Sequence, residues 1–219
     1  MKKKHALILG GTGATGQELV KLLLKDSTFE KVSIFSRRKI NIQNKKLSIH
    51  VIDFSRLDHY ADLIMGDVLF SALGTTLADA GSKTNQYLVD FEYQYNFAKI
   101  AANNGIDIFS LVSSYGANAK SIFFYPKLKG MLEQKIKSLS FKNIQIFQPS
   151  FLIRQLDMIR PTEKIVVRFF NIIARIYFFK SFKPIAVKDL ALKMVVESKF
   201  YKNKKITFYE PKNLFNYKK

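Results

Sequence analysis

Short apolar runs alternate with helically spaced apolar positions along most of the chain. Continuous apolar runs are typical of strands buried on both faces of a sheet, and apolar positions three or four apart are typical of helices packed on one side. We expect strands at 6–9, 32–35, 47–52, 68–71, 108–112, 144–147 and 206–209. We expect helices at 17–24, 57–64, 85–103, 125–139 and 188–199. This alternation predicts an α/β fold with a doubly wound, mostly parallel sheet, whose ligands lie beyond the carboxyl ends of the strands.

The segment 164–180 has a different pattern. Four polar residues recur along it at helical spacing and apolar residues fill the other positions. The polar stripe argues against a transmembrane span. The wide apolar face suits packing on the core, a wall of a substrate pocket, a dimer interface or a membrane surface. We favour the core or the pocket wall.

A glycine-rich turn, GGTGATG, joins the first apolar run to the first helical pattern. In a dinucleotide-binding turn, Gly10 would permit the tight bend, Gly13 would let the backbone approach a pyrophosphate, and Gly16 would let helix and strand pack closely. The free N–H groups of the following helix would point at the phosphates. The cofactor-binding residues that we expect in this turn are Gly10, Thr12, Gly13, Ala14, Thr15 and Gly16.

The second predicted strand ends in Ser36-Arg37-Arg38, where a site that prefers NAD(H) would offer a carboxylate to the ribose 2′-hydroxyl. A guanidinium can bind a 2′-phosphate through two hydrogen bonds and can stack on adenine. The sequence therefore predicts that NADP(H) is preferred over NAD(H). The alternative is that these arginines belong to a generally basic surface.

Two further strand ends carry candidate cofactor contacts. Asp53 and Phe54 follow the third strand, where the carboxylate could accept a hydrogen bond from the adenine amine and the ring could cover the base. An Asp after a strand is also a common helix cap. A loop of small residues follows the fourth strand and could lie along the ribose on the nicotinamide side. Its expected contact residues are Ala72, Leu73, Gly74 and Thr75.

Tyr125 and Lys129 form a Tyr-x-x-x-Lys pair downstream of Ser113 and Ser114. Four residues apart on a helix, they share a face, so the ammonium can lower the pKa of the phenol and bind the nicotinamide ribose. Tyr125 would then be an acid–base group, and one serine hydroxyl would hold the substrate oxygen. Pro126 is tolerated only in a first helical turn, which predicts a helix that begins near Tyr125.

Composition and charge exclude some kinds of site and bear on the kind of partner. The chain has 219 residues, 47% of them hydrophobic, and no cysteine, which excludes disulfides and thiolate metal sites. Its three histidines are scattered, so we expect no metal, and we expect a cytoplasmic location. The net charge of +19 makes nucleic acid or an anionic membrane a candidate partner. Because the lysines are spread along the chain, we attribute this charge to a compositional bias and expect no specific nucleic acid.

In their order along the chain, these motifs resemble the atypical short-chain dehydrogenase/reductases, and the Tat-interacting-protein-like oxidoreductases among them. The resemblance implies NADPH at the glycine turn, and it implies that Leu152 and Arg160 close over the nicotinamide. Aligning Val-Ser-Ser favours Ser114 as the catalytic serine. Gln148 departs from the pattern, since the family usually has Arg there. We expect one Rossmann domain over 1–219, in which 150–219 form a small cap on the substrate side.

The sequence thus predicts an NADPH-dependent oxidoreductase, a monomer or homodimer, that transfers hydride between the nicotinamide and a small carbonyl or alcohol substrate. Its catalytic residues would be Tyr125 and Lys129 with Ser113 or Ser114. One alternative is an NADPH-binding redox sensor that has lost turnover and acts through a protein partner. A weaker alternative is a basic protein associated with nucleic acid.

Overall fold

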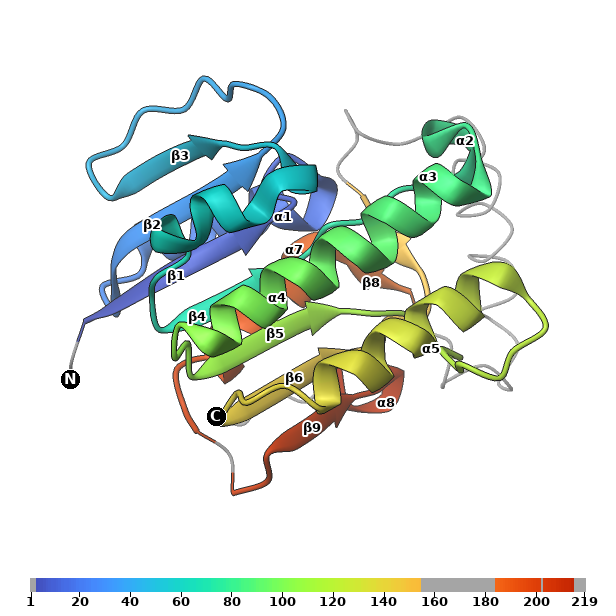
Figure 1. The fold of residues 1–219 in the computed structure, drawn as a ribbon. Helices are drawn as coiled ribbons and strands as arrows, with labels where there is room; N and C mark the ends of the chain where they lie inside the picture. The colour runs from blue at the N-terminus through green and yellow to red at the C-terminus, as the bar shows by residue number, and fades with distance from the viewer. Residues whose placement is uncertain (1–2, 155–183, 202, 215–219) are drawn as a thin grey trace.

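The computed structural model describes residues 3–154, 184–201 and 203–214. Its centre is a seven-stranded sheet in the order β3-β2-β1-β4-β5-β6-β9, parallel throughout (Figure 1). The strands are β1 (Lys4–Leu9), β2 (Phe29–Ser36), β3 (Leu47–Val51), β4 (Val68–Ser71), β5 (Ile108–Val112), β6 (Asn143–Phe147) and β9 (Ile206–Tyr209). Most of the central strands are buried along their length, as an all-parallel sheet covered on both faces requires.

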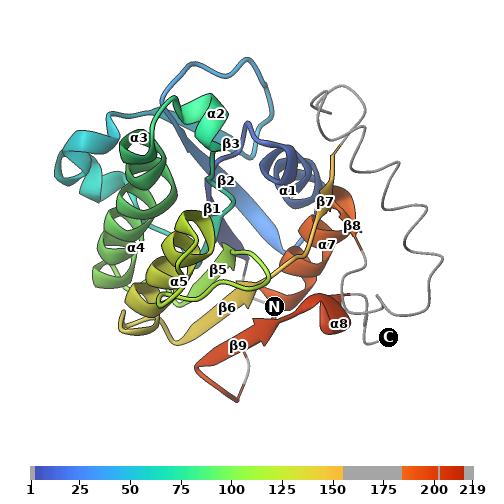
Figure 2. The same ribbon diagram turned by 90° about the vertical axis from the view of Figure 1, so that its right-hand side faces the viewer.

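Helices cover both faces of this sheet (Figure 2). On one face, α1 (Ala14–Lys25) contacts α7 (Val187–Glu197). On the other face lie η1 (Phe54–Leu63), α4 (Tyr93–Asn103) and α5 (Phe124–Lys137). A separate hydrophobic cluster fills the space beneath each layer. The remaining elements are α2 (Leu77–Ala80), α3 (Lys83–Tyr87), η2 (Leu88–Glu92), α8 (Pro211–Leu214) and the two-stranded pair β7 (Leu152–Ile153) with β8 (Ile185–Ala186).

The strand order reverses at β1, which pairs with β2 on one side and with β4 on the other. Successive strands run outward from this point in both directions, so the connecting loops diverge and leave a crevice at the carboxyl ends. Gly10 closes β1 there, with φ +78°. A Cβ on Gly10 would lie 2.6 Å from the Ala72 carbonyl oxygen, at the end of β4. The point at which the strand order reverses, called the switch point below, therefore requires a residue without a side chain.

The predicted doubly wound parallel sheet is confirmed. The helix expected at 85–103 is continuous but contains a π-helical turn, η2, between α3 and α4. Within the described part of 150–219, the segment expected to form a cap, β7 contributes Leu152 to the carboxyl edge, α7 packs on α1, and β9 is an edge strand of the main sheet. The segment 164–180 lies outside the described residues.

Candidate functional site

A cavity of about 680 Å³ opens at the switch point. It extends from the glycine turn past the end of β4 to the first turn of α5. Its lining residues are Gly13, Ala14, Thr15, Ala72, Leu73, Gly74, Thr75, Thr76, Leu77, Lys83, Gln86, Asp90, Val112, Ser113, Phe124, Tyr125, Lys129, Leu152 and Arg154. Segments far apart in the chain therefore meet at one place, as the fold predicts for a ligand site.

The glycine turn is shaped for a phosphate group. Gly13 is the N-cap of α1, and it lines the cavity together with Ala14 and Thr15, so the positive end of the helix dipole faces the cavity. The first turn of α1 has no acidic residue to offset this charge. A Cβ on Gly13 would meet only the Gly10 carbonyl oxygen, at 3.4 Å, so the space on its cavity side is open. A Cβ on Gly16 would lie 1.9 Å from the same oxygen. Gly16 therefore holds the helix against the turn, and Gly13 leaves room for a ligand.

Lys129 and Asp90 form a buried ion pair at the other end of the cavity. Lys129 Nζ lies 2.9 Å from Asp90 Oδ1, with side-chain exposures of 4% and 1%. Asp90 Oδ2 accepts a hydrogen bond of 3.0 Å from the Thr75 N–H. A Cβ on Gly74 would come within 3.2 Å of Asp90 Oδ1. The loop after β4 is therefore held against this ion pair.

The electrostatics keep Lys129 charged. Burial works against the ammonium, but Tyr125, Asp90 and Glu133 all favour it, and the net result is that the pKa of Lys129 lies above its ordinary value. Asp90 occupies the π-helical turn η2, and Gln94 anchors that turn by donating to the Asp90 carbonyl. Sequence reasoning missed Asp90, because no local motif distinguishes it from other helical carboxylates.

Tyr125 lies at the mouth of the cavity, in the first turn of α5, and is 40% exposed. Lys129 Nζ lies 5.8 Å from the centroid of its ring. Pro126 is in the first turn, as predicted. A Cβ on Gly130 would lie 2.2 Å from the Ala119 nitrogen, so this glycine lets the loop before α5 pack on the helix. The sequence Tyr-x-x-x-Lys-Gly thus places Tyr125 at the mouth of the cavity, Lys129 inside it and Gly130 against the loop before α5.

Ser113 lies inside the cavity, whereas Ser114 lies outside it and donates to the Tyr115 carbonyl. The geometry therefore favours Ser113 over the serine that alignment suggests. Ser113 Oγ donates to Glu133 Oε1 at 2.5 Å, and Gln148 Nε2 donates to the same oxygen at 2.8 Å. Since its proton goes to this buried carboxylate, Ser113 offers lone pairs to the cavity. To donate to a substrate carbonyl, as predicted, Ser113 would first have to give up this hydrogen bond to Glu133.

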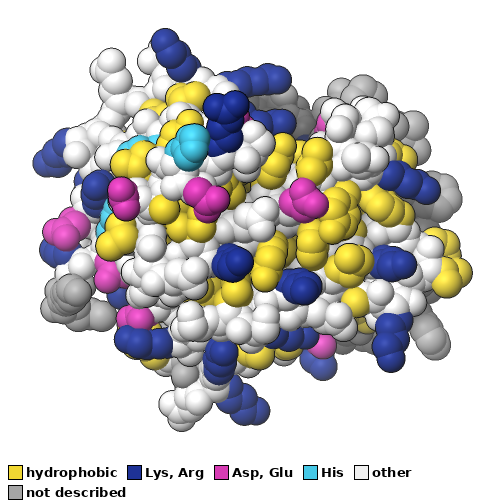
Figure 3. Space-filling model, in the orientation of Figure 1, with side chains coloured by type: hydrophobic (Ala, Val, Ile, Leu, Met, Phe, Trp, Pro, Cys, Tyr) yellow, Lys and Arg dark blue, Asp and Glu magenta, His cyan; other side chains and the backbone are white. Residues whose placement is uncertain are grey.

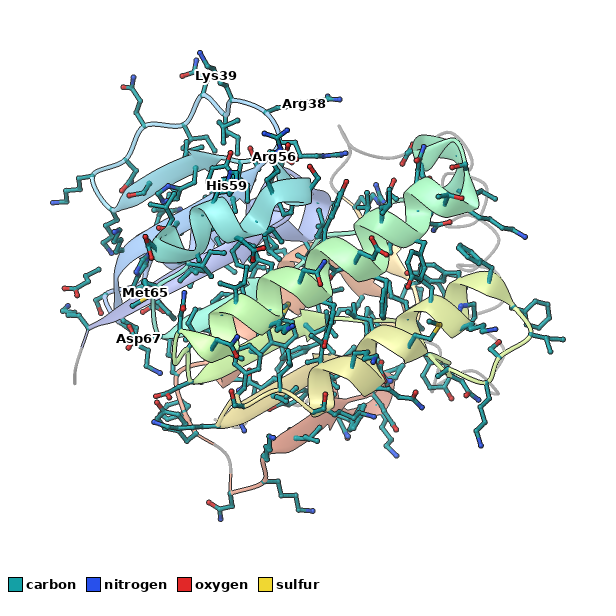
Figure 4. All side chains as sticks on the ribbon, viewed as in Figure 1. Arg38, Lys39, Arg56, His59, Met65 and Asp67 are labelled. Carbon is teal, nitrogen blue, oxygen red and sulfur yellow. The ribbon has the colours of Figure 1, made fainter. Side chains whose placement is uncertain are left out.

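Basic side chains gather beyond the ends of β2 and β3, outside the cavity. Ser36 Oγ donates to the Arg38 carbonyl, forming a turn from which Arg37 and Arg38 project as exposed side chains. Arg56, at the start of η1, lies on the same corner of the molecule as Arg38 (Figure 4). Arg56 Nε is 4.0 Å from Asp53 Oδ2 across an exposed gap. Arg56 was not among the predicted residues, because the contacts expected after the third strand were limited to Asp53 and Phe54.

The predicted adenine contacts are partly wrong. The Phe54 ring is 6% exposed and packs 5.3 Å from the Tyr93 ring in the core, so it does not cover a base. Asp53 is exposed and caps η1. It accepts from the Ser55 hydroxyl at 2.7 Å and from the Ser55 N–H at 2.9 Å. These hydrogen bonds hold the pKa of Asp53 below its usual value. The helix-cap alternative therefore accounts for Asp53 in this structure.

The cavity brings together most of the predicted site residues from the turn, the β4 loop and α5, together with Leu152. Gly10 and Gly16 shape the turn from behind, and Thr12 is exposed at its outer side. Arg160 lies outside the described residues. The lining residues that sequence reasoning missed are Leu77, Lys83, Gln86, Asp90, Val112, Phe124 and Arg154.

Comparison with known proteins places these features in a family. The NAD(P)H-binding family matches residues 10–140. Rat protein HTATIP2 is 36% identical over 175 residues, which cover 78% of this chain and 72% of that protein. Protein FMP52-1, mitochondrial, of Scheffersomyces stipitis is 37% identical over 153 residues, covering 68% and 67%. Among solved structures, UDP-N-acetylglucosamine 4-epimerase from Methanobrevibacter ruminantium shares the fold with a TM-score of 0.71 at 17% identity, covering 96% of this chain and 77% of the epimerase.

The cytoplasmic prediction is contradicted by these relatives. FMP52 proteins from several yeasts are named mitochondrial. The prediction rested on the absence of cysteine, which excludes disulfides but does not distinguish one compartment from another. Among the residues that the structure describes, no helix combines the length and apolarity needed to cross a bilayer. The same residues contain no cluster of three or more His, Asp or Glu arranged for a metal ion.

Proposed function

We propose that this chain, which belongs to the NAD(P)H-binding family and is related to the HTATIP2 and FMP52 proteins, is an NADPH-dependent oxidoreductase. Its proposed substrate is a small carbonyl or alcohol compound. The observation that carries this proposal is the buried Lys129–Asp90 pair behind Tyr125, in the same cavity as the glycine turn. A site that only binds a cofactor has no use for a buried ammonium near a tyrosine. A site that uses the tyrosine as an acid or base does, because the ammonium stabilises the deprotonated phenol.

The residues present fit the cofactor. The backbone of the glycine turn and the start of α1 would hold the pyrophosphate, because the space beside Gly13 is open: a Cβ there would meet only the Gly10 carbonyl oxygen. The loop Ala72–Thr75 would lie along the nicotinamide-side ribose, and Lys129 would bind its hydroxyls. Bound NADPH supplies the hydride. The remaining chemistry falls to the side chains of the cavity.

Tyr125 is the proposed proton donor. Its hydroxyl would give a proton to the carbonyl oxygen of the substrate as the carbonyl carbon is reduced, and the ammonium of Lys129 would stabilise the resulting phenolate. Ser113, whose proton goes to Glu133, would accept a hydrogen bond from the hydroxyl of Tyr125 or of an alcohol product. In this arrangement Ser113 orients the reacting group, and Tyr125 transfers the proton.

We also propose that the protein binds NADPH more tightly than NADH. Arg37 and Arg38 are exposed at the end of β2, with Arg56 on the same corner, and no carboxylate ends that strand. One charge-assisted hydrogen bond to a 2′-phosphate contributes about 1.5–3 kcal/mol, so NADPH should bind at least about tenfold more tightly than NADH. Arg37→Ala should remove most of this difference, whereas Lys39→Ala, which removes a charge from the same loop, should retain it. Calorimetric titration that shows equal affinities in the unmodified protein would contradict the preference.

The proposed activity is tested by following the absorbance of NADPH across a panel of small aldehydes and ketones. Oxidation of NADPH that depends on one of these compounds supports an oxidoreductase. Tight NADPH binding with no turnover on any member of the panel would favour the redox-sensor alternative.

A further inference from the structure

A buried carboxylate, Glu133, lies directly behind the cavity. It belongs to α5, one helical turn after Lys129, and is 4% exposed. Lys129 and Ser113 line the cavity, and Glu133 is in contact with Ser113 from behind. A carboxylate is rarely buried in a protein unless it is paired or hydrogen-bonded. The contacts that hold Glu133 in this position therefore indicate its role.

One oxygen of Glu133 accepts two side-chain hydrogen bonds. Its Oε1 accepts from the Ser113 hydroxyl at 2.5 Å and from the Gln148 amide at 2.8 Å. Both donors are neutral, and a hydrogen bond to a carboxylate is stronger than one between two neutral groups. A serine hydroxyl has a single proton, and in Ser113 this hydrogen bond uses it.

The main sheet fixes the backbone of both donors. The Ser113 N–H donates to the Phe147 carbonyl at 2.7 Å, which continues the pairing of β5 with β6 by one residue. The Gln148 N–H donates to the Tyr209 carbonyl at 2.9 Å, at the end of the pairing of β6 with β9. Ser113 and Gln148 are therefore held at the carboxyl edge of the sheet, where Glu133 of α5 accepts from both.

This arrangement decides what Ser113 can offer to a ligand. Because the hydroxyl proton is directed to Glu133, the cavity receives the lone pairs of Ser113 Oγ. The oxygen of a carbonyl compound also has only lone pairs, so Ser113 could donate to it only by giving up the hydrogen bond to Glu133. The hydroxyl of an alcohol can donate to Ser113 and leave that hydrogen bond intact.

We infer that Glu133 is a positioning residue that determines specificity: by holding the proton of Ser113, it makes the cavity bind the alcohol form of a substrate more tightly than the carbonyl form. This inference rests on the proposed function and specifies which member of the redox pair the site favours. Glu133 acts only through the hydroxyl of Ser113. Tyr125 remains the group that exchanges a proton with the reacting oxygen.

The test uses two probes, cumyl alcohol and acetophenone, that cannot react in the complex with NADP⁺. Cumyl alcohol has no hydrogen on its carbinol carbon and cannot be oxidised, and acetophenone finds no hydride to reduce it. Each probe is titrated into the full chain saturated with NADP⁺, and its dissociation constant is measured by ligand-observed NMR. We expect the unmodified protein to bind the alcohol more tightly than the ketone. The ratio of the two dissociation constants is then compared between variants, so that the difference in size of the probes cancels.

Three variants assign the preference to Glu133. Glu133→Gln should lower the ratio about fivefold, because a neutral acceptor holds the Ser113 proton less strongly than a carboxylate does. In a Ser113→Ala background, Glu133→Gln should change the ratio by less than about twofold, since the hydroxyl that couples the two effects is gone. Glu18→Gln, which changes a buried carboxylate outside the cavity, should leave the ratio as it is. A purely structural role of Glu133 would weaken both probes alike and would not move the ratio.

Equal or tighter binding of the ketone by the unmodified protein overturns the inference, and so does the absence of measurable binding by either probe. An unchanged ratio in Glu133→Gln, or an equal change in the Ser113→Ala background, also overturns it. A parallel calorimetric titration with NADPH separates these outcomes from the proposed function. Intact NADPH binding with any of them defeats the role of Glu133 alone, whereas absent NADPH binding defeats the proposed function and this inference with it.

Discussion

At the scale of single residues, the charge on Lys129 depends on Asp90. Asp90→Asn keeps the shape of the side chain but leaves the buried ammonium without its carboxylate partner. Removing one member of a buried ion pair typically costs about 3–5 kcal/mol. We expect a loss toward the lower end, because Tyr125 and Glu133 also favour the ammonium. Thermal or denaturant unfolding at neutral pH measures it.

Glu92→Gln is the matched control for this change. It removes a carboxylate from the same π-helical turn but lies outside the cavity. Its effect on the free energy of unfolding should stay within about 0.5 kcal/mol, as for most substitutions away from buried features. If the two variants change the free energy of unfolding equally, Asp90 does not stabilise the charged form of Lys129.

The residues that the sequence could and could not predict differ in how they make contact. Tyr125 and Lys129 lie one helical turn apart, so their spacing alone brings them together. Asp90 contacts Lys129 from η2, and Glu133 of α5 contacts Ser113, which follows β5. Only the packing of these elements determines such contacts. Phe54 was misassigned because a residue at a strand end can point to the core as readily as to the ligand edge.

At the scale of elements, two glycines of the turn have separable roles. Gly13→Ala should fold with little loss of stability, since its Cβ would meet only one oxygen at 3.4 Å, but it should weaken NADPH binding at least about tenfold by occupying the space for the pyrophosphate. Gly16→Ala should destabilise the fold itself, because its Cβ would lie 1.9 Å from the Gly10 carbonyl oxygen. Unfolding temperatures and calorimetric NADPH titration distinguish these outcomes. Equal effects of the two substitutions on both quantities would contradict the assignment.

The strands were predictable at this scale, because a run such as Val68–Ser71 is apolar and ends at turn residues on both sides. The π-helical turn was not, since nothing in the residues Leu88–Glu92 distinguishes a π-helical turn from an α-helical one. The position of α7 was also not predictable. An amphipathic helix shows which of its faces is buried but not which partner covers it, and the partner here is α1.

At the scale of the whole molecule, stability should depend on pH through His5. Burial, together with the charges of Lys31 and His50, lowers the pKa of His5 to about 4 from 6.5, against the opposing charge of Asp67. Between these values the unfolded chain binds a proton that the folded protein does not. The contribution of His5 is therefore fully present above pH 6.5 and is lost as the pH falls toward 4.

Because His5 is about half buried, we discount the full shift for solvent screening and expect a loss of about 1–2 kcal/mol. Denaturant unfolding across this pH range, compared between the unmodified protein and His5→Gln, isolates the effect. His59→Gln, at an exposed position on η1, is the control. An identical pH dependence in the unmodified protein and in His5→Gln would rule out this contribution.

The net charge of +19 is a second property of the whole molecule. On the face shown in Figure 3, Lys and Arg side chains are scattered between apolar and uncharged ones and do not gather in one patch. This distribution agrees with a compositional bias. The absence of a specific nucleic-acid partner stays a prediction.

The central claim is that Tyr125 transfers a proton in a cavity that also binds NADPH. The most direct test compares Tyr125→Phe with the unmodified protein, on any carbonyl compound that the panel identifies, by the rate of NADPH oxidation and by calorimetric NADPH affinity. We predict that turnover falls by at least about 100-fold, the usual contribution of a general acid, while NADPH affinity stays within a few-fold. Unchanged turnover in Tyr125→Phe would contradict the claim and would make the Tyr-x-x-x-Lys spacing a coincidence of a lysine-rich chain.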